Sequence, residues 1–201
     1  ALSIIDNTFA TPINQNPLDL GIDIVTHSGT KYLGGHSDLC CGAVLTRKDL
    51  TAKISATAAN LGGSMNAMTC YLLERSLKTL SLRIEKHNRN ARIIAEHLQN
   101  DGRIKTVFYP GLESHPGHAL AARQMRGFSG MVTFEIKGGH AAARRFVQAL
   151  RLFTSAVSLG GVESLVEIPH DMTHSVMQGT AMAVDPAMVR LSVGLEHADD
   201  L

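Results

Sequence analysis

A single lysine among hydroxyls and glycines, directly after a short apolar strand, is the feature that most constrains this chain. Residues 22–26 (IDIVT) predict the strand, and residues 27–38 continue as HSGTKYLGGHSD. Short, mostly apolar runs are typical of strands that are covered on both faces. The glycines that follow let the backbone approach a ligand closely. We therefore expect Lys31 to be functional, although most lysines are solvated surface residues.

Other polar side chains fit the same interpretation. Ser28 and Thr30 alternate along an extended segment, so both hydroxyls can point the same way and hydrogen-bond a phosphate. Asp6 ends another apolar strand, predicted over residues 2–6, and Thr8 follows it. A lysine that forms a Schiff base, hydroxyls for a phosphate and an aspartate for a pyridinium nitrogen are the minimal set for pyridoxal 5′-phosphate (PLP). Taken singly, the hydroxyls are also ordinary turn residues and the aspartate an ordinary strand-end cap.

Composition and charge argue against several other classes of function. The 201 residues are 44% hydrophobic and carry a formal net charge of +1, which is ordinary for a globular protein. No basic stripe indicates a nucleic-acid partner, and no run of about 18 apolar residues predicts a membrane span. The three cysteines predict no disulfide framework, so we expect a cytoplasmic location. The ten histidines lack metal-ligand spacing, so we expect no metal site and structural roles for His27, His36 and His174.

Both ends of the sequence predict a fragment of a longer chain. Residues 1–5 (ALSII) have no initiating Met and are typical of the middle of a buried strand. Residues 196–201 (EHADDL) are typical of the start of a helix. We therefore expect the chain to be truncated at both ends.

The hydrophobic pattern changes character near the middle of the chain. In the first part we expect strands at 2–6, 22–26 and 42–46, and helices at 17–21, 48–59 and 66–99. From residue 103 we expect strands at 104–109, 130–136, 154–159 and 189–193, and helices at 118–125 and 141–150. This order predicts a domain boundary inside the long helix, with residues 1–87 in one domain and residues 88–201 in a small α+β domain.

Motifs along the whole chain resemble those of the Cys/Met-metabolism family of PLP-dependent enzymes, the transsulfuration enzymes. The matching segments are 6–12 (DNTFATP), 28–38 (SGTKYLGGHSD), 75–80 (RSLKTL), 82–83 (LR), 109–112 (YPGL), 115–116 (HP), 130–131 (GM), 158–165 (SLGGVESL), 172–174 (MTH) and 189–194 (VRLSVG). The resemblance implies an α/β architecture of the aspartate-aminotransferase type (fold type I). A mixed, mostly parallel cofactor-domain sheet is then followed by a C-terminal α+β domain. It also implies a homotetramer, built as a dimer of dimers.

The same resemblance implies roles in cofactor binding for residues of the first motifs. Lys31 is expected to bind PLP covalently and to move protons during the reaction. Asp6 is expected to pair with the pyridinium nitrogen. Thr8 is expected either to pack against the ring or to hydrogen-bond near its phenolic oxygen. Ser28 and Thr30 are expected to bind the phosphate. Further cofactor contacts are expected from a missing N-terminal half, which is therefore required for activity, and from a neighbouring subunit.

The later motifs imply a site for the substrate. Ser158 and Arg190 are expected to bind its α-carboxylate, with Thr173 nearby. A planar guanidinium suits this task because it binds a carboxylate through two parallel hydrogen bonds. Val157 departs from the family pattern, since cystathionine-using members usually carry a glutamate just before the serine. An apolar side chain cannot attract the distal ammonium of cystathionine, so Val157 favours a neutral thioether or an acylated homoserine as substrate.

Together these expectations favour PLP-dependent γ-elimination from a sulfur amino acid such as methionine or cystathionine, which yields 2-oxobutyrate, ammonia and a thiol. The first alternative is γ-replacement on an O-acylhomoserine, as in cystathionine γ-synthase or a sulfhydrylase. Two alternatives come from other classes: a non-catalytic homologue that binds PLP, and a fold relative that catalyses transamination. Elimination and replacement both remain open at this point.

Overall fold

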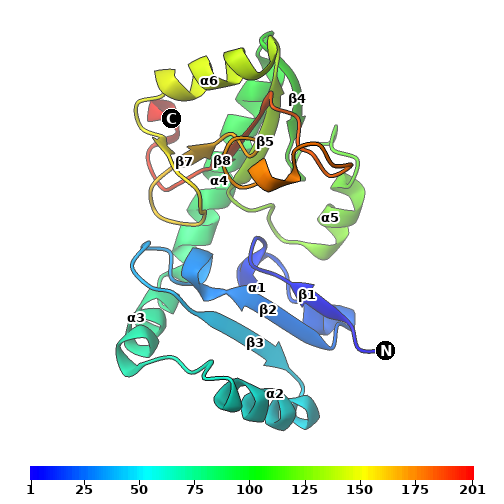
Figure 1. The fold of residues 1–201 in the computed structure, drawn as a ribbon, viewed down its shortest axis with the longest axis vertical. Coiled ribbons are helices and arrows are strands. Elements are labelled where there is room, and N and C mark those ends of the chain that lie inside the picture. Colours follow the sequence, from blue (N-terminus) through cyan, green and yellow to red (C-terminus); the bar gives the residue numbers. More distant parts are fainter.

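Two β-sheets occupy the lower and upper halves of the molecule and are connected by a long helix (Figure 1). The arrangement comes from a computed structural model that describes residues 1–201. The first sheet has the strand order β1-β2-β3, and the second has the order β4-β5-β8-β7-β6. Helix α4 (Leu80–Asn100) runs from the first half to the second. The mixed α/β architecture is confirmed, and the predicted boundary between residues 87 and 88 falls inside α4 and stays a prediction.

The first sheet brings the ends of two parallel strands to one edge. Its strands are β1 (Ile4–Asp6), β2 (Ile24–Ser28) and β3 (Gly42–Thr46). β1 and β2 are parallel and β2 and β3 antiparallel, so the sheet is mixed as expected. Between β1 and β2 lie α1 (Thr11–Asn14) and a 3₁₀ turn, Pro17–Leu20. Because Asp6 is the register partner of Thr26, Asp6 and Ser28 end near the same edge.

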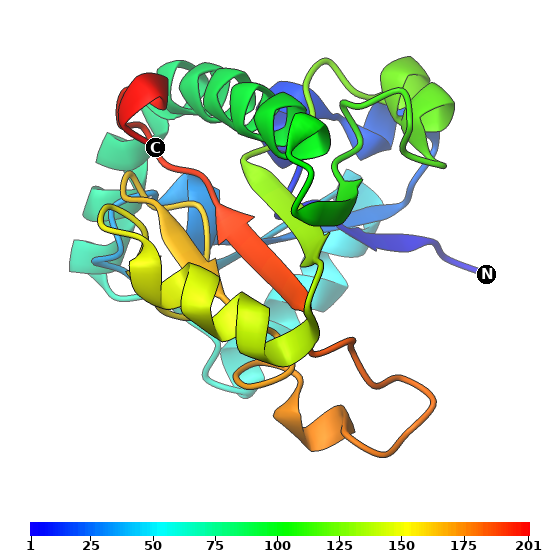
Figure 2. The same ribbon diagram turned by 90° about the horizontal axis from the view of Figure 1, so that it is seen from above.

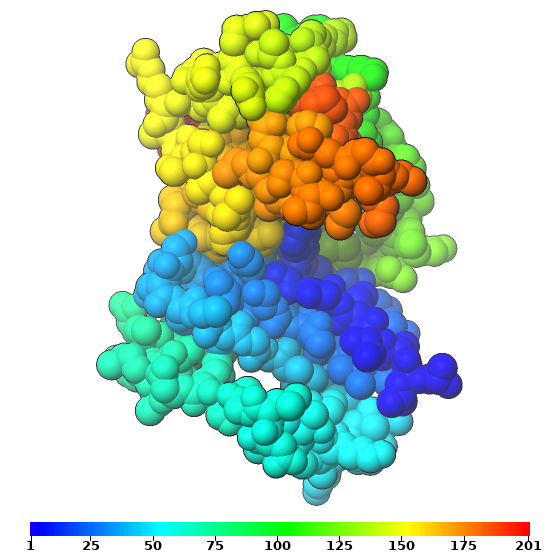
Figure 3. All heavy atoms as spheres, viewed as in Figure 1, coloured from blue at the N-terminus to red at the C-terminus, as the bar shows by residue number.

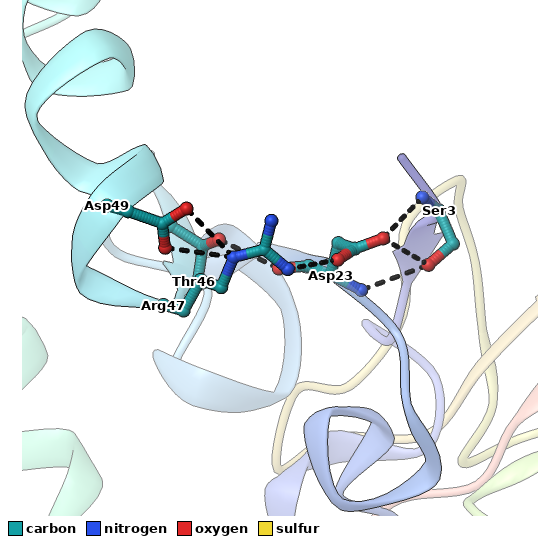
Figure 4. A network of polar contacts seen from close by, with 5 residues as sticks. All are labelled: Ser3, Asp23, Thr46, Arg47 and Asp49. Atoms are coloured by element: carbon teal, nitrogen blue, oxygen red, sulfur yellow. Dashed lines mark hydrogen bonds and ion pairs between the residues drawn. The ribbon is translucent and has the colours of Figure 1, made fainter. Parts of the chain in front are cut away.

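A network of polar contacts ties the three strands together at the other edge of this sheet (Figure 4). Asp23 accepts hydrogen bonds from the backbone N–H of Ser3 at 2.9 Å and from its hydroxyl at 3.1 Å. Arg47 bridges Asp23 and Asp49, and the Thr46 hydroxyl donates to the carbonyl of Asp23 at 2.7 Å. The bonds from Ser3, that of its N–H above all, and the contact with Arg47 lower the pKa of the Asp23 carboxyl. The network is solvent-exposed, so it fixes the strand register more than it adds stability.

The second sheet is antiparallel except at one edge. Its strands are β4 (Ile104–Phe108), β5 (Met131–Ile136), β6 (Thr154–Ser155), β7 (Leu165–Glu167) and β8 (Met188–Ser192). Only β6 and β7 pair in parallel. Helix α5 (His118–Gln124) lies beside the sheet, and α4 and α6 (Gly139–Ala149) cross over its strands when the molecule is seen from above (Figure 2).

A core of 17 buried residues fills the space between the second sheet and its two helices. Ala91 and Ala95 of α4 and Ala143 of α6 are fully buried there, with Val132 and Phe134 of β5. Each large apolar side chain that is buried in this way contributes about 1.5–3 kcal/mol. A smaller core joins both halves of the chain and consists of Tyr32, Leu33, Leu80, Ile84, Met131 and Leu159. The sheet face opposite α4 and α6 therefore turns toward the segment that carries Lys31.

The prediction of one helix over residues 66–99 is wrong. The structure has two helices, α3 (Ala67–Leu77) and α4, separated at Lys78 and Thr79. The amide N–H groups of these two residues bond to carbonyls three residues back, and Thr79 has φ −109° and ψ 7°. At the break, the Ser76 carbonyl also accepts a 2.9 Å hydrogen bond from Arg83.

One predicted strand differs from the structure, and one strand of the structure was not predicted. The strand expected over residues 154–159 is only two residues long, because Ser158 has φ 101°, which a strand does not accommodate. Strand β7 was not predicted, because its three residues are all buried and are too few to show an alternating pattern.

The remaining predicted helices and strands are confirmed within a few residues. Helix α2 (Lys48–Asn60) is one of them, although none of its residues is buried. It lies at the lower end of the molecule, away from the second sheet, whereas the segment near residue 175 lies directly above the N-terminal strand (Figure 3). No helix in the molecule has both the length and the hydrophobicity that a membrane crossing requires.

Candidate active site

Lys31 lies in one turn of π-helix that follows β2 directly. The turn covers Gly29–Leu33, and Lys31 itself departs from helical geometry with φ −91° and ψ −124°. The turn is closed by hydrogen bonds from the Gly34 N–H to the Gly29 carbonyl at 2.8 Å and from the Gly35 N–H to the Lys31 carbonyl at 2.7 Å. Lys31 lines an open pocket, the candidate active-site pocket, with Asp6, Thr8, Phe9, Ser28 and Leu159. Lysine, aspartate and serine from two separate strand ends thus share one pocket, as the sequence predicts.

Buried polar contacts hold the backbone just after Lys31. Arg83, 5% exposed, donates to the carbonyl of Tyr32 at 2.7 Å and to that of Leu33 at 3.3 Å. The Tyr32 hydroxyl lies 3.1 Å from the Ser129 hydroxyl, and burial raises its pKa to about 12. Neither Arg83 nor Tyr32 was singled out at the sequence level, although both stand inside the matching motifs. The lysine is therefore mounted on a turn that both halves of the chain support.

The Lys31 amine contacts Ser158, which comes from the second half of the chain. Its Nζ donates to the Ser158 hydroxyl oxygen at 2.7 Å. Ser158 is one of four non-glycine residues with positive φ, and such strain is typical of functional positions. Gly160 packs so closely that a Cβ there would lie 2.7 Å from the Tyr32 nitrogen. Its own N–H donates to the Ser192 hydroxyl at 2.9 Å, which links this segment to β8.

The predicted cofactor residues differ in what their side chains already bind. Asp6 accepts the Thr8 N–H at 2.8 Å through one carboxylate oxygen, and the Thr8 hydroxyl accepts the Ser28 N–H at 2.8 Å. The second Asp6 oxygen and the Ser28 hydroxyl make no hydrogen bond within the protein. The Thr30 hydroxyl is instead engaged with the backbone of Cys41, at 3.0 Å from its nitrogen and 3.3 Å from its oxygen, and does not line the pocket.

Arg190 lies on β8, on the face that points away from α4 and α6. An ion pair of 3.0 Å joins its Nη2 to Oε1 of Glu167, its register partner on β7. The Thr173 hydroxyl donates to the same Oε1 at 3.0 Å. Thr173 therefore contacts Glu167, and sequence reasoning missed Glu167 because a single buried glutamate carries no motif. The positive charge of Arg190 opposes the rise in the pKa of the buried Tyr32 hydroxyl.

Two other predicted residues sit near this site. Val157 is 49% exposed and directly precedes Ser158. His27 is buried on β2, and loss of hydration lowers its pKa. A histidine that stays neutral in this way fits the structural role expected for it. No group of three or more His, Cys, Asp or Glu side chains in the molecule is arranged to hold a metal ion.

The residues in the pocket suit PLP. The amine of Lys31, the free carboxylate oxygen of Asp6 and the free hydroxyl of Ser28 match an aldehyde, a pyridinium nitrogen and a phosphate. The donors that this chain offers to a phosphate are neutral hydroxyls. The charged donors that a phosphate usually takes are not among the pocket-lining residues, apart from Lys31.

Comparisons with known proteins agree with this chemistry. The family described as "Cys/Met metabolism PLP-dependent enzyme" matches residues 1–201. The chain is 46% identical to cystathionine beta-lyase from Lactococcus lactis over 100% of its own length and 54% of the relative's. It is 48% identical to cystathionine gamma-synthase from Mycobacterium leprae, covering 98% of this chain and 51% of that protein. It is 47% identical to L-methionine gamma-lyase from Pseudomonas deceptionensis, covering 98% of this chain and 51% of that protein.

Solved structures show the same similarity. The metB protein from Corynebacterium glutamicum superimposes with a TM-score of 0.96 at 43% identity, over 100% of this chain and 52% of that one. Cystathionine gamma synthase from Xanthomonas oryzae pv. oryzae, in complex with aminoacrylate and cysteine, gives a TM-score of 0.95 at 47% identity, over 100% and 53% of the two chains. The chain thus spans about half the length of the relatives it matches.

Proposed function

This chain belongs to the Cys/Met-metabolism family of PLP-dependent enzymes, and we propose that it forms the C-terminal part of an enzyme that breaks a C–S bond in a sulfur amino acid. The favoured reaction is γ-elimination from methionine or cystathionine, giving 2-oxobutyrate, ammonia and a thiol. The observation that carries the proposal is the 2.7 Å contact between Lys31 and Ser158, in a pocket that Asp6 and Ser28 also line.

Each residue of the site has a separate role in this reaction. PLP, when bound, supplies an electron sink for the bonds around Cα of an amino acid. Lys31 would hold it, take a proton from Cα and then from Cβ of the substrate, and give a proton to the departing sulfur, because its Nζ is the only side-chain amine in the pocket. The Ser158 hydroxyl keeps Nζ oriented. Asp6 keeps the ring nitrogen protonated, and Arg190 binds the α-carboxylate.

Replacement chemistry remains the second candidate, since synthases and lyases are equally similar to this chain. Val157 supports a substrate without a distal ammonium, and both methionine and an O-acylhomoserine meet that condition. The proposal includes a homotetramer and a cytoplasmic location, supported by the family resemblance and by the cysteine usage respectively. A PLP-binding homologue without activity is the alternative from another class.

One product assay on the complete, PLP-loaded protein tests the proposal. Methionine, cystathionine, and O-acetylhomoserine with a thiol are supplied separately, and 2-oxobutyrate, free thiol and new thioether are measured. We expect 2-oxobutyrate and thiol from methionine. Thioether formed without 2-oxobutyrate selects replacement. A protein that turns over none of these substrates, but shows a visible cofactor band that borohydride abolishes, supports the non-catalytic alternative.

A further inference from the structure

Glu167 is a buried carboxylate to which no motif assigns a role. It is 2% exposed and faces Arg190 directly across the β7–β8 pair. Its Oε1 lies 3.0 Å from Nη2 of Arg190, and its Oε2 is buried without any hydrogen-bond partner. Burying a carboxylate is costly unless the charge is paired, and one oxygen here is not satisfied at all. An apolar residue would suit this strand better if packing were the only requirement.

The contact leaves Arg190 able to bind a second carboxylate. Nη2 carries two hydrogens, so a contact at this one atom leaves one of the two bidentate edges of the guanidinium free. The Arg190 side chain is 19% exposed and makes no other ion pair. Glu167 therefore orients the guanidinium and leaves one of its two edges free.

Thr173 and His174 hold Glu167 in turn. An ionised carboxylate only accepts hydrogen bonds, so the Thr173 proton points toward Oε1, 3.0 Å away. The Thr173 oxygen must then accept from Nδ1 of His174, which lies 2.9 Å from it. His174 thus donates to Thr173, and Thr173 donates to Glu167, which pairs with Arg190.

We propose that Glu167 is a positioning residue for the substrate's α-carboxylate, acting through Arg190, and that Thr173 acts through Glu167 without touching the substrate. The inference rests on the proposed function, in which Arg190 binds that carboxylate. It predicts a defect that is specific to ligands with a carboxylate. A merely structural role predicts equal losses for ligands with and without one.

The test uses two ligands that differ only in the carboxylate, and neither requires turnover. Norleucine has the length of methionine but no leaving group at Cγ, and pentylamine is norleucine without its carboxylate. Their Kd values are measured by calorimetry on the complete, PLP-loaded protein. The variants are Glu167→Ala, Glu167→Gln, Thr173→Val, Arg190→Ala and the double variant of Glu167 and Arg190 to Ala. Glu96→Ala, which removes a carboxylate from the exposed pair with Arg92, is the matched control.

We expect Glu167→Ala to raise the Kd of norleucine about tenfold and Thr173→Val to raise it about threefold. The Kd of pentylamine should change less than about twofold in both variants. Glu167→Gln keeps an acceptor oxygen for both partners, so its norleucine Kd stays within about threefold of wild type. The double variant should bind norleucine no more weakly than Arg190→Ala, because both changes remove one interaction. If Glu167→Ala does not fold, Thr173→Val tests the same selective loss of norleucine binding, with an expected loss of about threefold.

Two different results distinguish the possible failures. Selective norleucine binding by the wild type, with equal losses for both ligands in the variants or additive losses in the double variant, overturns the positioning role alone. If the wild type binds norleucine and pentylamine equally well, Arg190 does not bind the α-carboxylate. That result would contradict the proposed function itself.

Discussion

The amine of Lys31 and the guanidinium of Arg190 are held in two different ways. The Lys31 turn is held through its backbone, since Arg83 binds the carbonyls of the next two residues and the Tyr32 side chain is buried between both halves of the chain. Arg190 is held through its side chain, by strand register and one ion pair with Glu167. We therefore expect changes around Lys31 to affect chemistry or folding, and changes around Arg190 to affect substrate affinity.

The largest effect is expected for Lys31→Ala in the complete protein. Without the amine, no group in the pocket moves the proton at Cα, so kcat falls roughly a thousandfold or more. The melting temperature should change little, because the backbone anchors of the turn remain. Lys53→Ala on the exposed helix α2 is the control. Near-normal turnover by the Lys31 variant would refute the assignment.

Arg190→Ala should instead act on KM. The substrate carboxylate loses a charge-assisted partner, which costs roughly 2–4 kcal/mol, or about 30- to 900-fold in KM. The cofactor absorbance should stay unchanged, because Lys31 and its turn are untouched. Steady-state kinetics with methionine measures the split between kcat and KM, with Arg145→Ala on the exposed face of α6 as control. An unchanged KM would show that the substrate carboxylate does not bind to Arg190.

The anchoring of Lys31 also predicts a pH dependence of stability. The ring of His87 packs edge-on against that of Tyr32, with 5.1 Å between the ring centroids, and is fully buried. Loss of hydration lowers the pKa of His87 to about 4. The unfolded chain protonates this ring near its ordinary pKa of about 6.5, while the folded chain does not. The contribution of His87 to the free energy of unfolding is therefore fully present above about pH 6.5. It is lost as the pH falls toward about 4, which lowers the free energy of unfolding by up to about 3 kcal/mol.

Urea unfolding of the complete protein at several pH values measures this dependence. His87→Asn keeps a donor for the Val193 carbonyl and removes the titrating ring, so its stability should change less between pH 7 and about pH 5. His97→Asn, on the exposed side of α4, is the control. Identical pH profiles for the wild type and the His87 variant contradict the role given to this histidine.

The smallest expected effect concerns specificity beside Ser158. Val157→Glu places a carboxylate at a half-exposed position, where it can attract the distal ammonium of cystathionine. The ratio of kcat/KM for cystathionine to that for methionine should rise by up to about fivefold, the value of one exposed ion pair. Val157→Gln has nearly the shape of Glu without its charge and should not raise the ratio. An unchanged ratio with Val157→Glu would contradict a role for Val157 in substrate specificity.

How far the sequence leads depends on whether a feature is local. The lysine turn, the aspartate at the end of β1 and the hydroxyl of Ser28 follow directly from residues adjacent to strands, and the structure places them in one pocket. At the break between α3 and α4, which the sequence pattern did not predict, Arg83 reaches back to the Ser76 carbonyl. The contact between Lys31 and Ser158 joins residues 127 positions apart, and no local pattern encodes such a distance.

The sequence alone determined the family and the cofactor and predicted which lysine binds that cofactor, because these depend on residue types at short, fixed spacing. Only the tertiary structure decided that Thr173 contacts Glu167, that Thr30 is engaged with the Cys41 backbone and that Glu167 faces Arg190. The physical reason is that hydrogen bonds and ion pairs depend on ångström-scale positions in space. Those positions are set by the pairing of β7 with β8 and by the packing of the two halves of the chain.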